Sequence, residues 1–268
     1  ILSGLVGSEM CIRDSHVMRA AAESLTPVTL ELGGKSPAIL SADVPLNHAA
    51  ERIAFGKTLN AGQTCVAPDY VLVPHDRVEG FVEAYRQAVQ RLYPQVDGNP
   101  DYTSIINTRQ HQRLSDYLDD ARDKGATVIT LTTAGAERRM SPTLLLNVDD
   151  SMRVMQDEIF GPLLPVVPYE RLSDALAYIA ARPRPLALYY FGYDRSEQQH
   201  VLHHSHSGGV CLNDTLMHVA QDDMPFGGVG ASGMGHYHGH EGFLTFSKAK
   251  GVPVSYTHLR AHETREDL

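Results

Sequence analysis

The sequence has no apolar run that approaches the roughly 18 residues of a membrane-spanning helix, and no basic region precedes its first residues. It has no strongly basic run either: 23 Lys and Arg stand against 32 Asp and Glu, a net charge of −9. These absences argue against membrane surfaces and nucleic acid as partners. We expect a cytoplasmic protein whose ligands are small molecules.

Cysteine is also scarce. The three residues, Cys11, Cys65 and Cys211, are odd in number, far apart and without a Cys-x-x-Cys pair. This pattern is typical of free thiols in a reducing compartment rather than of a disulfide framework. The chain is nevertheless long enough, at 268 residues with 43% hydrophobic residues, to bury a sizeable core in one large or two modest domains.

Short β-branched runs alternate with segments of helical periodicity, which predicts a layered α/β fold. Strands are predicted at residues 28–32, 38–40, 70–73, 128–131, 143–148, 164–167 and 186–193. Helices are predicted at residues 46–54, 78–92, 108–124, 172–181 and 196–204, the second of them with Asp76 as its N-cap. The glycine-rich residues 208–242 are predicted to be mostly loop.

Two residues with catalytic potential, Cys65 and Glu31, lie close to predicted strands. Cys65 lies between a helical segment and a strand, which places it on a loop held by rigid elements, although a lone cysteine is more often an inert buried residue. Glu31 lies at the end of an apolar strand, where burial would raise its pKa into the range of a general base. The alternative is an ion pair between Glu31 and Lys35.

Four motifs in this order resemble those of the aldehyde dehydrogenase superfamily. They are Val-Thr-Leu-Glu-Leu-Gly-Gly-Lys-Ser-Pro at 28–37, Gly-Gln-Thr-Cys at 62–65, Glu-Ile-Phe-Gly-Pro at 158–162, and Pro-Phe-Gly-Gly at 225–228, followed by Ser-Gly. The separation of 34 residues between Glu31 and Cys65 also agrees with that family. The resemblance covers residues 16–252, and the last part is most similar to the branch of coniferyl-aldehyde and fatty-aldehyde dehydrogenases.

The resemblance implies a reaction and its groups. The thiolate of Cys65 would attack an aldehyde carbonyl, hydride would pass to NAD or NADP, and Glu31 would activate the water that releases a carboxylic acid. The aldehyde would be coniferyl aldehyde or another aromatic or aliphatic one. The implied parent enzyme is a homodimer or homotetramer.

It also implies cofactor-binding residues. Glu158 would hold a ribose hydroxyl, Phe160 would pack near the nicotinamide, and Leu32 and Gly33 would line its pocket. Without the motif, Phe160 is as readily interpreted as a core aromatic.

The implied fold is a three-layer α/β/α catalytic domain at residues 34–242. Residues 16–33 would be the remnant of a Rossmann-like cofactor domain, and residues 243–254 a C-terminal segment. Residues 1–15 and 255–268 show no period that places them on a packed element, and we expect them to be non-native flanks. With most of the cofactor domain absent, we expect this fragment to be inactive alone in hydride transfer.

Two other functions stay open. The same thiol and carboxylate could hydrolyse activated esters without a cofactor. Fourteen histidines, with clusters at 200–206 and 236–240, could make the chain a noncatalytic metal-binding module. Neither cluster has a cysteine or carboxylate at a typical metal-ligand spacing apart from Glu241, so we expect no metal site.

Overall fold

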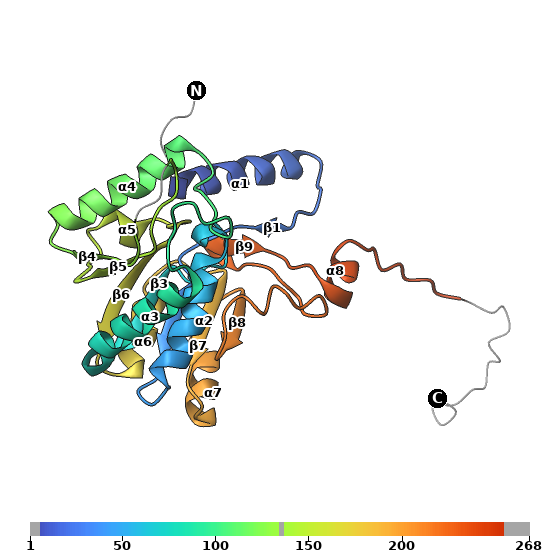
Figure 1. Cartoon of the computed structure of the whole chain (residues 1–268). Helices are drawn as coiled ribbons and strands as arrows, with labels where there is room; N and C mark the ends of the chain where they lie inside the picture. Colours follow the sequence, from blue (N-terminus) through green and yellow to red (C-terminus); the bar gives the residue numbers. More distant parts are fainter. Residues whose placement is uncertain (1–5, 134–136, 255–268) are drawn as a thin grey trace.

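The structure is a computed structural model, and it describes residues 6–133 and 137–254 (Figure 1). The expected C-terminal flank, residues 255–268, lies outside the described residues, as do residues 1–5 of the expected N-terminal flank. The side chains of residues 6–14, Cys11 among them, are not described. Within the described chain, no helix is both long and apolar enough to cross a bilayer.

A seven-stranded sheet forms the middle layer. Its spatial order is β4-β5-β6-β3-β2-β7-β8, and every pair is parallel except β4 with β5. The strands are β2 (Pro37–Leu40), β3 (Tyr70–Pro74), β4 (Thr127–Thr130), β5 (Thr143–Leu146), β6 (Leu163–Tyr169), β7 (Ala187–Phe191) and β8 (Gly209–Leu212). The inner strands are buried on both faces, which is typical of a parallel sheet between helical layers.

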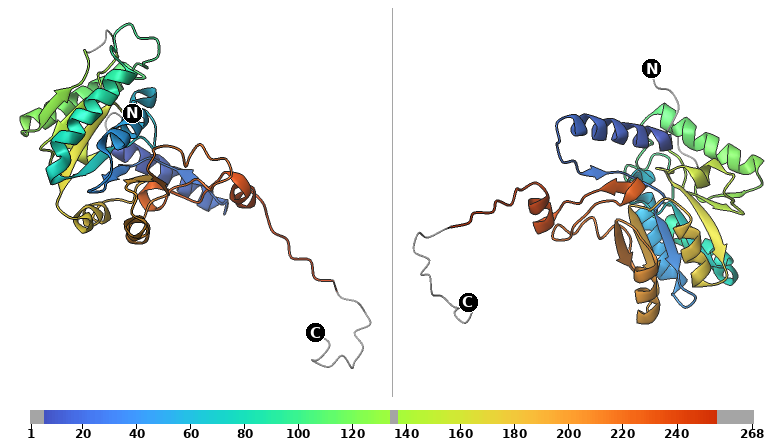
Figure 2. Two further views of the ribbon diagram at one scale, coloured as in Figure 1. Left: turned by 60° about the horizontal axis from the view of Figure 1, so that its bottom comes forward. Right: turned by 180° about the vertical axis from the view of Figure 1, so that it is seen from behind.

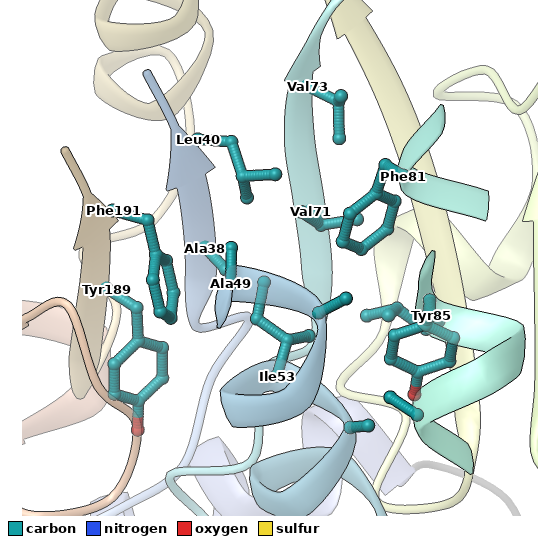
Figure 3. Packing of buried hydrophobic residues seen from close by; sticks show 14 of the residues in the cluster. Ala38, Leu40, Ala49, Ile53, Val71, Val73, Phe81, Tyr85, Tyr189 and Phe191 are labelled. Atoms are coloured by element: carbon teal, nitrogen blue, oxygen red, sulfur yellow. The ribbon is translucent and has the colours of Figure 1, made fainter. Parts of the chain in front are cut away.

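Helices cover both faces of this sheet (Figures 1 and 2). They are α2 (Leu46–Thr58), α3 (Val78–Leu92), α4 (Thr108–Asp123), α5 (Arg153–Gln156), α6 (Leu172–Ala180) and α7 (Arg195–His204). Ala38 and Leu40 of β2 pack toward α2 and α3 (Figure 3), whereas Ile39 packs toward α6 and α7. Alternate residues of one strand thus enter different cores, and the predicted three-layer α/β/α fold is confirmed.

The helix α3 begins at Val78, as its apolar periodicity predicts, but the predicted cap is wrong. Asp76 lies inside the short 3-10 turn η2 (His75–Arg77), and Arg77 occupies the N-cap position. The Arg77 guanidinium donates to the carbonyl oxygens of residues 41, 42 and 44 and so anchors the turn to the preceding loop. The turn is thus held by tertiary contacts, and Arg77 provides no side-chain cap to α3.

The two ends of the described chain lie outside the main sheet. The helix α1 (Val6–Glu23) includes part of residues 1–15, for which the sequence predicted no element. The helix was not predicted because the apolar residues of α1 have little helical periodicity. The strand β1 (Leu30–Glu31) is shorter than the predicted 28–32 and pairs antiparallel with β9 (Gly233–Met234). After β9, the helix α8 (Gly239–Thr245) projects away from the sheet (Figures 1 and 2).

Candidate active site

The loop that carries Cys65 leaves the 3-10 turn η1 (Leu59–Gly62) with a left-handed backbone. Asn60 and Ala61 have φ angles of 51° and 53°, and Gly62 follows with a φ of +74°. A Cβ at Gly62 would lie 2.3 Å from the carbonyl oxygen of Gly161, so glycine is required for the two segments to approach each other. The loop is therefore packed against the Glu-Ile-Phe-Gly-Pro motif.

Gln63 fixes the same loop through its side chain. Its Nε2 donates to the carbonyl oxygens of Asn60 at 3.0 Å and Ser104 at 3.2 Å, and its Oε1 accepts from the backbone N–H of Ile106 at 2.9 Å. These bonds join the loop to the chain before α4. Cys65 lies, as predicted, on a loop held between a helix and the strand β3.

Glu31 is in direct contact with Cys65. Its Oε1 accepts a hydrogen bond from Sγ at 3.3 Å, and β1 positions it by pairing with Gly233 of β9. The Glu31 side chain is exposed, so the prediction of a buried carboxylate is wrong. The apolar neighbours of Glu31 in sequence do not enclose it, because β1 is only two residues long and pairs with one strand.

The alternative ion pair is also wrong. Lys35 Nζ donates to Asp69 and to the carbonyl oxygens of Val154 at 2.8 Å and Asp157 at 2.9 Å. Its charge is therefore directed into the interior, away from Glu31. The carboxylate of Glu31 is free to interact with the thiol.

The surroundings of Cys65 change its acidity. Burial, followed by the charge and hydrogen bond of Glu31, raises the pKa of the Cys65 thiol to about 12, and the charge of Glu158 acts in the same direction. At neutral pH the thiol is therefore protonated and donates to Glu31. Nucleophilic attack by Sγ has to begin with loss of this proton, and Glu31 is the base in contact with it.

A second hydroxyl donor reaches the same carboxylate. Tyr237 Oη donates to Oε2 of Glu31, across 206 residues of sequence. In the sequence this segment stands out for its histidines, its glycines and its resemblance to one branch of the family, and no role was predicted for the phenol of Tyr237. The His-Tyr-His pattern after the last glycine motif carries no signal for a contact with β1.

Glu158 occupies a different part of the candidate site. It lines a cavity of about 530 Å³ together with Gly33, Gly34, Lys35 and Ala231. A Cβ at Gly33 would lie 2.2 Å from Oε1 of Glu158, so this glycine lets the carboxylate lie against the backbone. Burial, reinforced by the nearby negative charge of Asp69, raises the pKa of Glu158 to about 7.

The backbone around Glu158 is held from the interior. Arg113 of α4 donates to the carbonyl oxygens of Glu158 at 3.2 Å and Ile159 at 2.7 Å. Asp69 accepts from the backbone N–H of Ile159 at 3.0 Å, and Lys35 forms an ion pair with Asp69. We call Lys35, Asp69 and Arg113 the clamp.

Lys57 lies near the clamp at the end of α2. Its side chain is fully buried, and its Nζ has no hydrogen-bond partner among the described residues. Burial lowers the pKa of Lys57 to about 8, although the charges of Asp69 and Glu158 favour the ammonium form. Lys57 could not be predicted as a buried residue from the sequence, since a lysine in an amphipathic helix is ordinarily a surface residue.

The structure brings together only part of the predicted cofactor set. Gly33 and Glu158 share one cavity, whereas Leu32 and Phe160 are not among the residues that line it. Leu32 donates its backbone N–H to the carbonyl oxygen of Ser232 at 3.0 Å. Phe160 is 39% exposed, so the interpretation of this residue as a core aromatic is wrong.

The remaining cysteine and the histidines form no comparable centre. Cys211 is buried on β8, with its Sγ 3.0 Å from Nδ1 of His218. In the described ranges, no group of three or more His, Cys, Asp or Glu side chains is arranged to hold a metal ion. The chemistry of the described chain is therefore concentrated at Cys65, Glu31 and the Glu158 cavity.

Comparison with known proteins places these residues in context. The model of the aldehyde dehydrogenase family matches residues 5–252. A protein of Pseudomonas aeruginosa named "Probable coniferyl aldehyde dehydrogenase" is 75% identical over 237 residues, covering 88% of this chain and 50% of that protein. A coniferyl aldehyde dehydrogenase of a Pseudomonas species is 51% identical over 245 residues, covering 89% and 51%. The chain spans about half the length of the curated relatives it matches.

Solved structures share the fold. The substrate-bound AldH of Staphylococcus aureus has a TM-score of 0.81 at 42% identity, covering 90% of this chain and 54% of that one. A Mycobacterium tuberculosis aldehyde dehydrogenase complexed with NAD+ has a TM-score of 0.82 at 31% identity, covering 92% and 52%. The sequence and the fold thus point to the same family.

Proposed function

The chain belongs to the aldehyde dehydrogenase family, and from this membership we propose that it carries the nucleophile and the general base of an enzyme that oxidises an aldehyde to a carboxylic acid with NAD or NADP. The observation that carries the proposal is the 3.3 Å contact between Cys65 Sγ and Glu31 Oε1. It joins a nucleophile to a base on a loop and a strand that are fixed by separate parts of the fold. The names of two Pseudomonas relatives support coniferyl aldehyde as the substrate.

The proposed steps use the two groups in turn. Glu31 accepts the thiol proton of Cys65, Sγ forms a bond to the aldehyde carbon, and the carbonyl oxygen takes the proton back from Glu31 to give a thiohemiacetal. A bound NAD or NADP would accept the hydride from that carbon, and loss of the hydroxyl proton to solvent would leave a thioester on Sγ. Glu31 then takes a proton from water, the hydroxyl oxygen bonds to the thioester carbon, and the C–S bond breaks to release the acid and return the thiol.

We propose that the Glu158 cavity holds a nicotinamide nucleotide. A carboxylate on a fixed backbone can accept hydrogen bonds from the hydroxyls of a ribose, and the adjacent Gly33 and Gly34 leave backbone accessible to a ligand. We propose Glu158, Gly33, Leu32 and Phe160 as the residues of this chain that hold the cofactor. The enzyme is proposed to be cytoplasmic and a homodimer or homotetramer.

The test is oxidation of coniferyl aldehyde by the protein expressed from its complete gene, followed by NADH or NADPH absorbance. Cys65→Ala should abolish product formation, and Glu31→Gln should lower it by about 10² to 10⁴-fold. Exposed Tyr193→Phe is the matched control and should leave the rate unchanged. Full activity of Cys65→Ala would refute the proposal.

The 268-residue chain alone is proposed to oxidise no aldehyde. It spans half of its relatives, and a hydride acceptor that is not held against Cys65 cannot react efficiently. Robust NADH formation from an aromatic aldehyde by this chain would overturn the expectation.

Hydrolysis of activated esters is a second candidate for the isolated chain. The specific observation in its favour is that Cys65 and Glu31 are already in contact within it. Release of p-nitrophenol from p-nitrophenyl acetate without NAD, lost in Cys65→Ala, would support this activity. A rate equal to that of Cys65→Ala would exclude it.

A further inference from the structure

Both carboxylate oxygens of Glu31 are occupied by donors from different parts of the fold. Oε1 accepts from Cys65 Sγ at 3.3 Å, and Oε2 accepts from the hydroxyl of Tyr237. Because the Glu31 side chain is exposed, nothing in its burial restricts its rotamer. Its orientation toward the thiol therefore depends on these two bonds.

Tyr237 is the better anchored of the two partners. Its backbone exchanges two hydrogen bonds with Phe226: its carbonyl oxygen accepts at 2.7 Å, and its N–H donates at 2.8 Å. Its ring lies edge-on to that of Phe226, with centroids 5.9 Å apart and planes at 87°. Phe226 is buried in the main core, so Tyr237 is tied to the body of the domain.

The phenol can act only as a donor to the carboxylate under ordinary conditions. Burial, with the bond to Glu31 and the charge of Glu31, raises the pKa of Tyr237 to about 12. The hydroxyl is therefore protonated at neutral pH, and it donates a charge-assisted hydrogen bond.

We propose that Tyr237 is a positioning residue that holds the Glu31 carboxylate against the Cys65 thiol. This inference rests on the proposed function, in which Glu31 is the general base. Among the described residues, the hydrogen bond of this hydroxyl goes to Glu31, so its effect on the thiol is exerted through that carboxylate. Tyr237 thus differs from Cys65 and Glu31, which are the proposed catalytic residues.

The geometry predicts two effects of opposite sign for Tyr237→Phe. Without the hydroxyl, Glu31 turns into solvent, and the thiol loses both its acceptor and the adjacent negative charge. Cys65 then ionises more easily and is alkylated faster. The carboxylate is, however, no longer placed to activate water, so deacylation slows by roughly 10- to 100-fold.

A structural role alone would give a different pattern. Loosening of the loop around Tyr237 would expose the other thiols and Cys65 alike and would change the unfolding transition. A positioning role changes the ionisation of Cys65 selectively. It also disappears when Glu31 is absent, since Tyr237 acts through that side chain.

The decisive experiment is iodoacetamide alkylation of the 268-residue chain between pH 6 and 10. The alkylated Cys65 peptide is quantified by mass spectrometry, and Cys211 serves as the internal reference. Tyr237→Phe should move the alkylation profile of Cys65 to lower pH, whereas Tyr193→Phe should leave it unchanged. In a Glu31→Ala background, Tyr237→Phe should have no further effect.

An unchanged profile in Tyr237→Phe, or an equal shift in the Glu31→Ala background, would overturn the proposal. If Tyr237→Phe fails to fold, Glu31→Ala against wild type still tests whether Glu31 suppresses thiol ionisation, and an unchanged profile there is equally contradictory. The p-nitrophenyl acetate assay measures the second effect. Tyr237→Phe should keep the initial burst of p-nitrophenol but should release p-nitrophenol more slowly in the steady state.

Failure of this inference and failure of the proposed function are separable. Aldehyde oxidation that persists in Cys65→Ala refutes the function, whatever Tyr237 does. A strict need for Cys65 and Glu31 together with a wild-type profile in Tyr237→Phe refutes only the positioning role.

Discussion

Glu31 and Glu158 belong to the same candidate site, but the fold holds them by different means. The Glu31 side chain is exposed, and in the described part of the chain its hydrogen bonds come from Cys65 and Tyr237. Glu158 is half-buried on a backbone that the clamp holds through several hydrogen bonds. A carboxylate that transfers protons has to change its contacts during a reaction, whereas one that binds a hydroxyl benefits from a fixed position.

The largest effect on stability is expected when the clamp is broken. Asp69 is 2% exposed, and it accepts from Lys35 and from the backbone of Ile159. Asp69→Ala leaves a buried ammonium without its partner and should lower the free energy of unfolding by about 3–5 kcal/mol. Urea denaturation at pH 7 measures this loss.

The matched control is Glu51→Ala, which removes an ion pair with Arg91 whose two side chains are each 55% exposed. Its loss should not exceed about 1 kcal/mol. Equal losses in the two variants would mean that the clamp contributes no more than a surface pair.

Lys57→Met should have the opposite sign. The folded chain lowers the pKa of Lys57 from 10.5 to about 8, so the buried ammonium opposes folding at every pH below 8. Methionine keeps the length of the side chain without the charge and should raise the free energy of unfolding at pH 7 by about 1–3 kcal/mol. The gain should shrink between pH 8 and 10.5, as measured by urea denaturation across that range. A gain independent of pH would indicate improved packing instead.

Glu158→Gln should stabilise the protein by a smaller amount, about 1–2 kcal/mol at pH 8. Folding raises the pKa of Glu158 from 4.5 to about 7, so the wild type loses stability as pH rises between those values while the variant does not. Thermal or urea unfolding at pH 4.5 and pH 8 measures the difference. Destabilisation at pH 8 would show that the ionised carboxylate is better accommodated than its burial indicates.

The smallest effect on stability is expected for Glu31→Gln, within about 0.5 kcal/mol, because the side chain is exposed. Its activity should nevertheless fall more than that of any clamp variant that still folds. A loss of stability as large as that of Asp69→Ala would contradict the contrast between the exposed Glu31 and the fixed Glu158. Urea denaturation and turnover measurements on Glu31→Gln and Asp69→Ala in parallel provide the test.

Local patterns predicted the fold well where burial follows the period or the length of an element. The helix α3 follows its apolar period from Val78 onward, and the strand β7 coincides with an apolar run that is buried on both faces. The cap of α3 could not be predicted, because Arg77 is held by carbonyl groups on another loop. The residues next to Arg77 in the sequence do not indicate such a tertiary contact.

The candidate site was predictable only as far as its motifs reach. They identified Cys65, Glu31 and Glu158, and the structure places the first two in contact. They misjudged the burial of Glu31, which depends on how few strands surround β1. They missed Tyr237 and Lys57, whose roles depend on contacts with segments that no spacing in the sequence connects to them.

The strands β1 and β9, which pair with each other, are synthesised at well separated times. Glu31 and Tyr237 are 206 residues apart, so at about 5–20 residues per second a ribosome needs roughly 10–40 s to produce the second after the first. Throughout that interval the β1 edge has no partner strand, and the thiol of the nascent chain lacks an oriented base. The contact between Glu31 and Tyr237 can therefore form only after the main sheet has been translated.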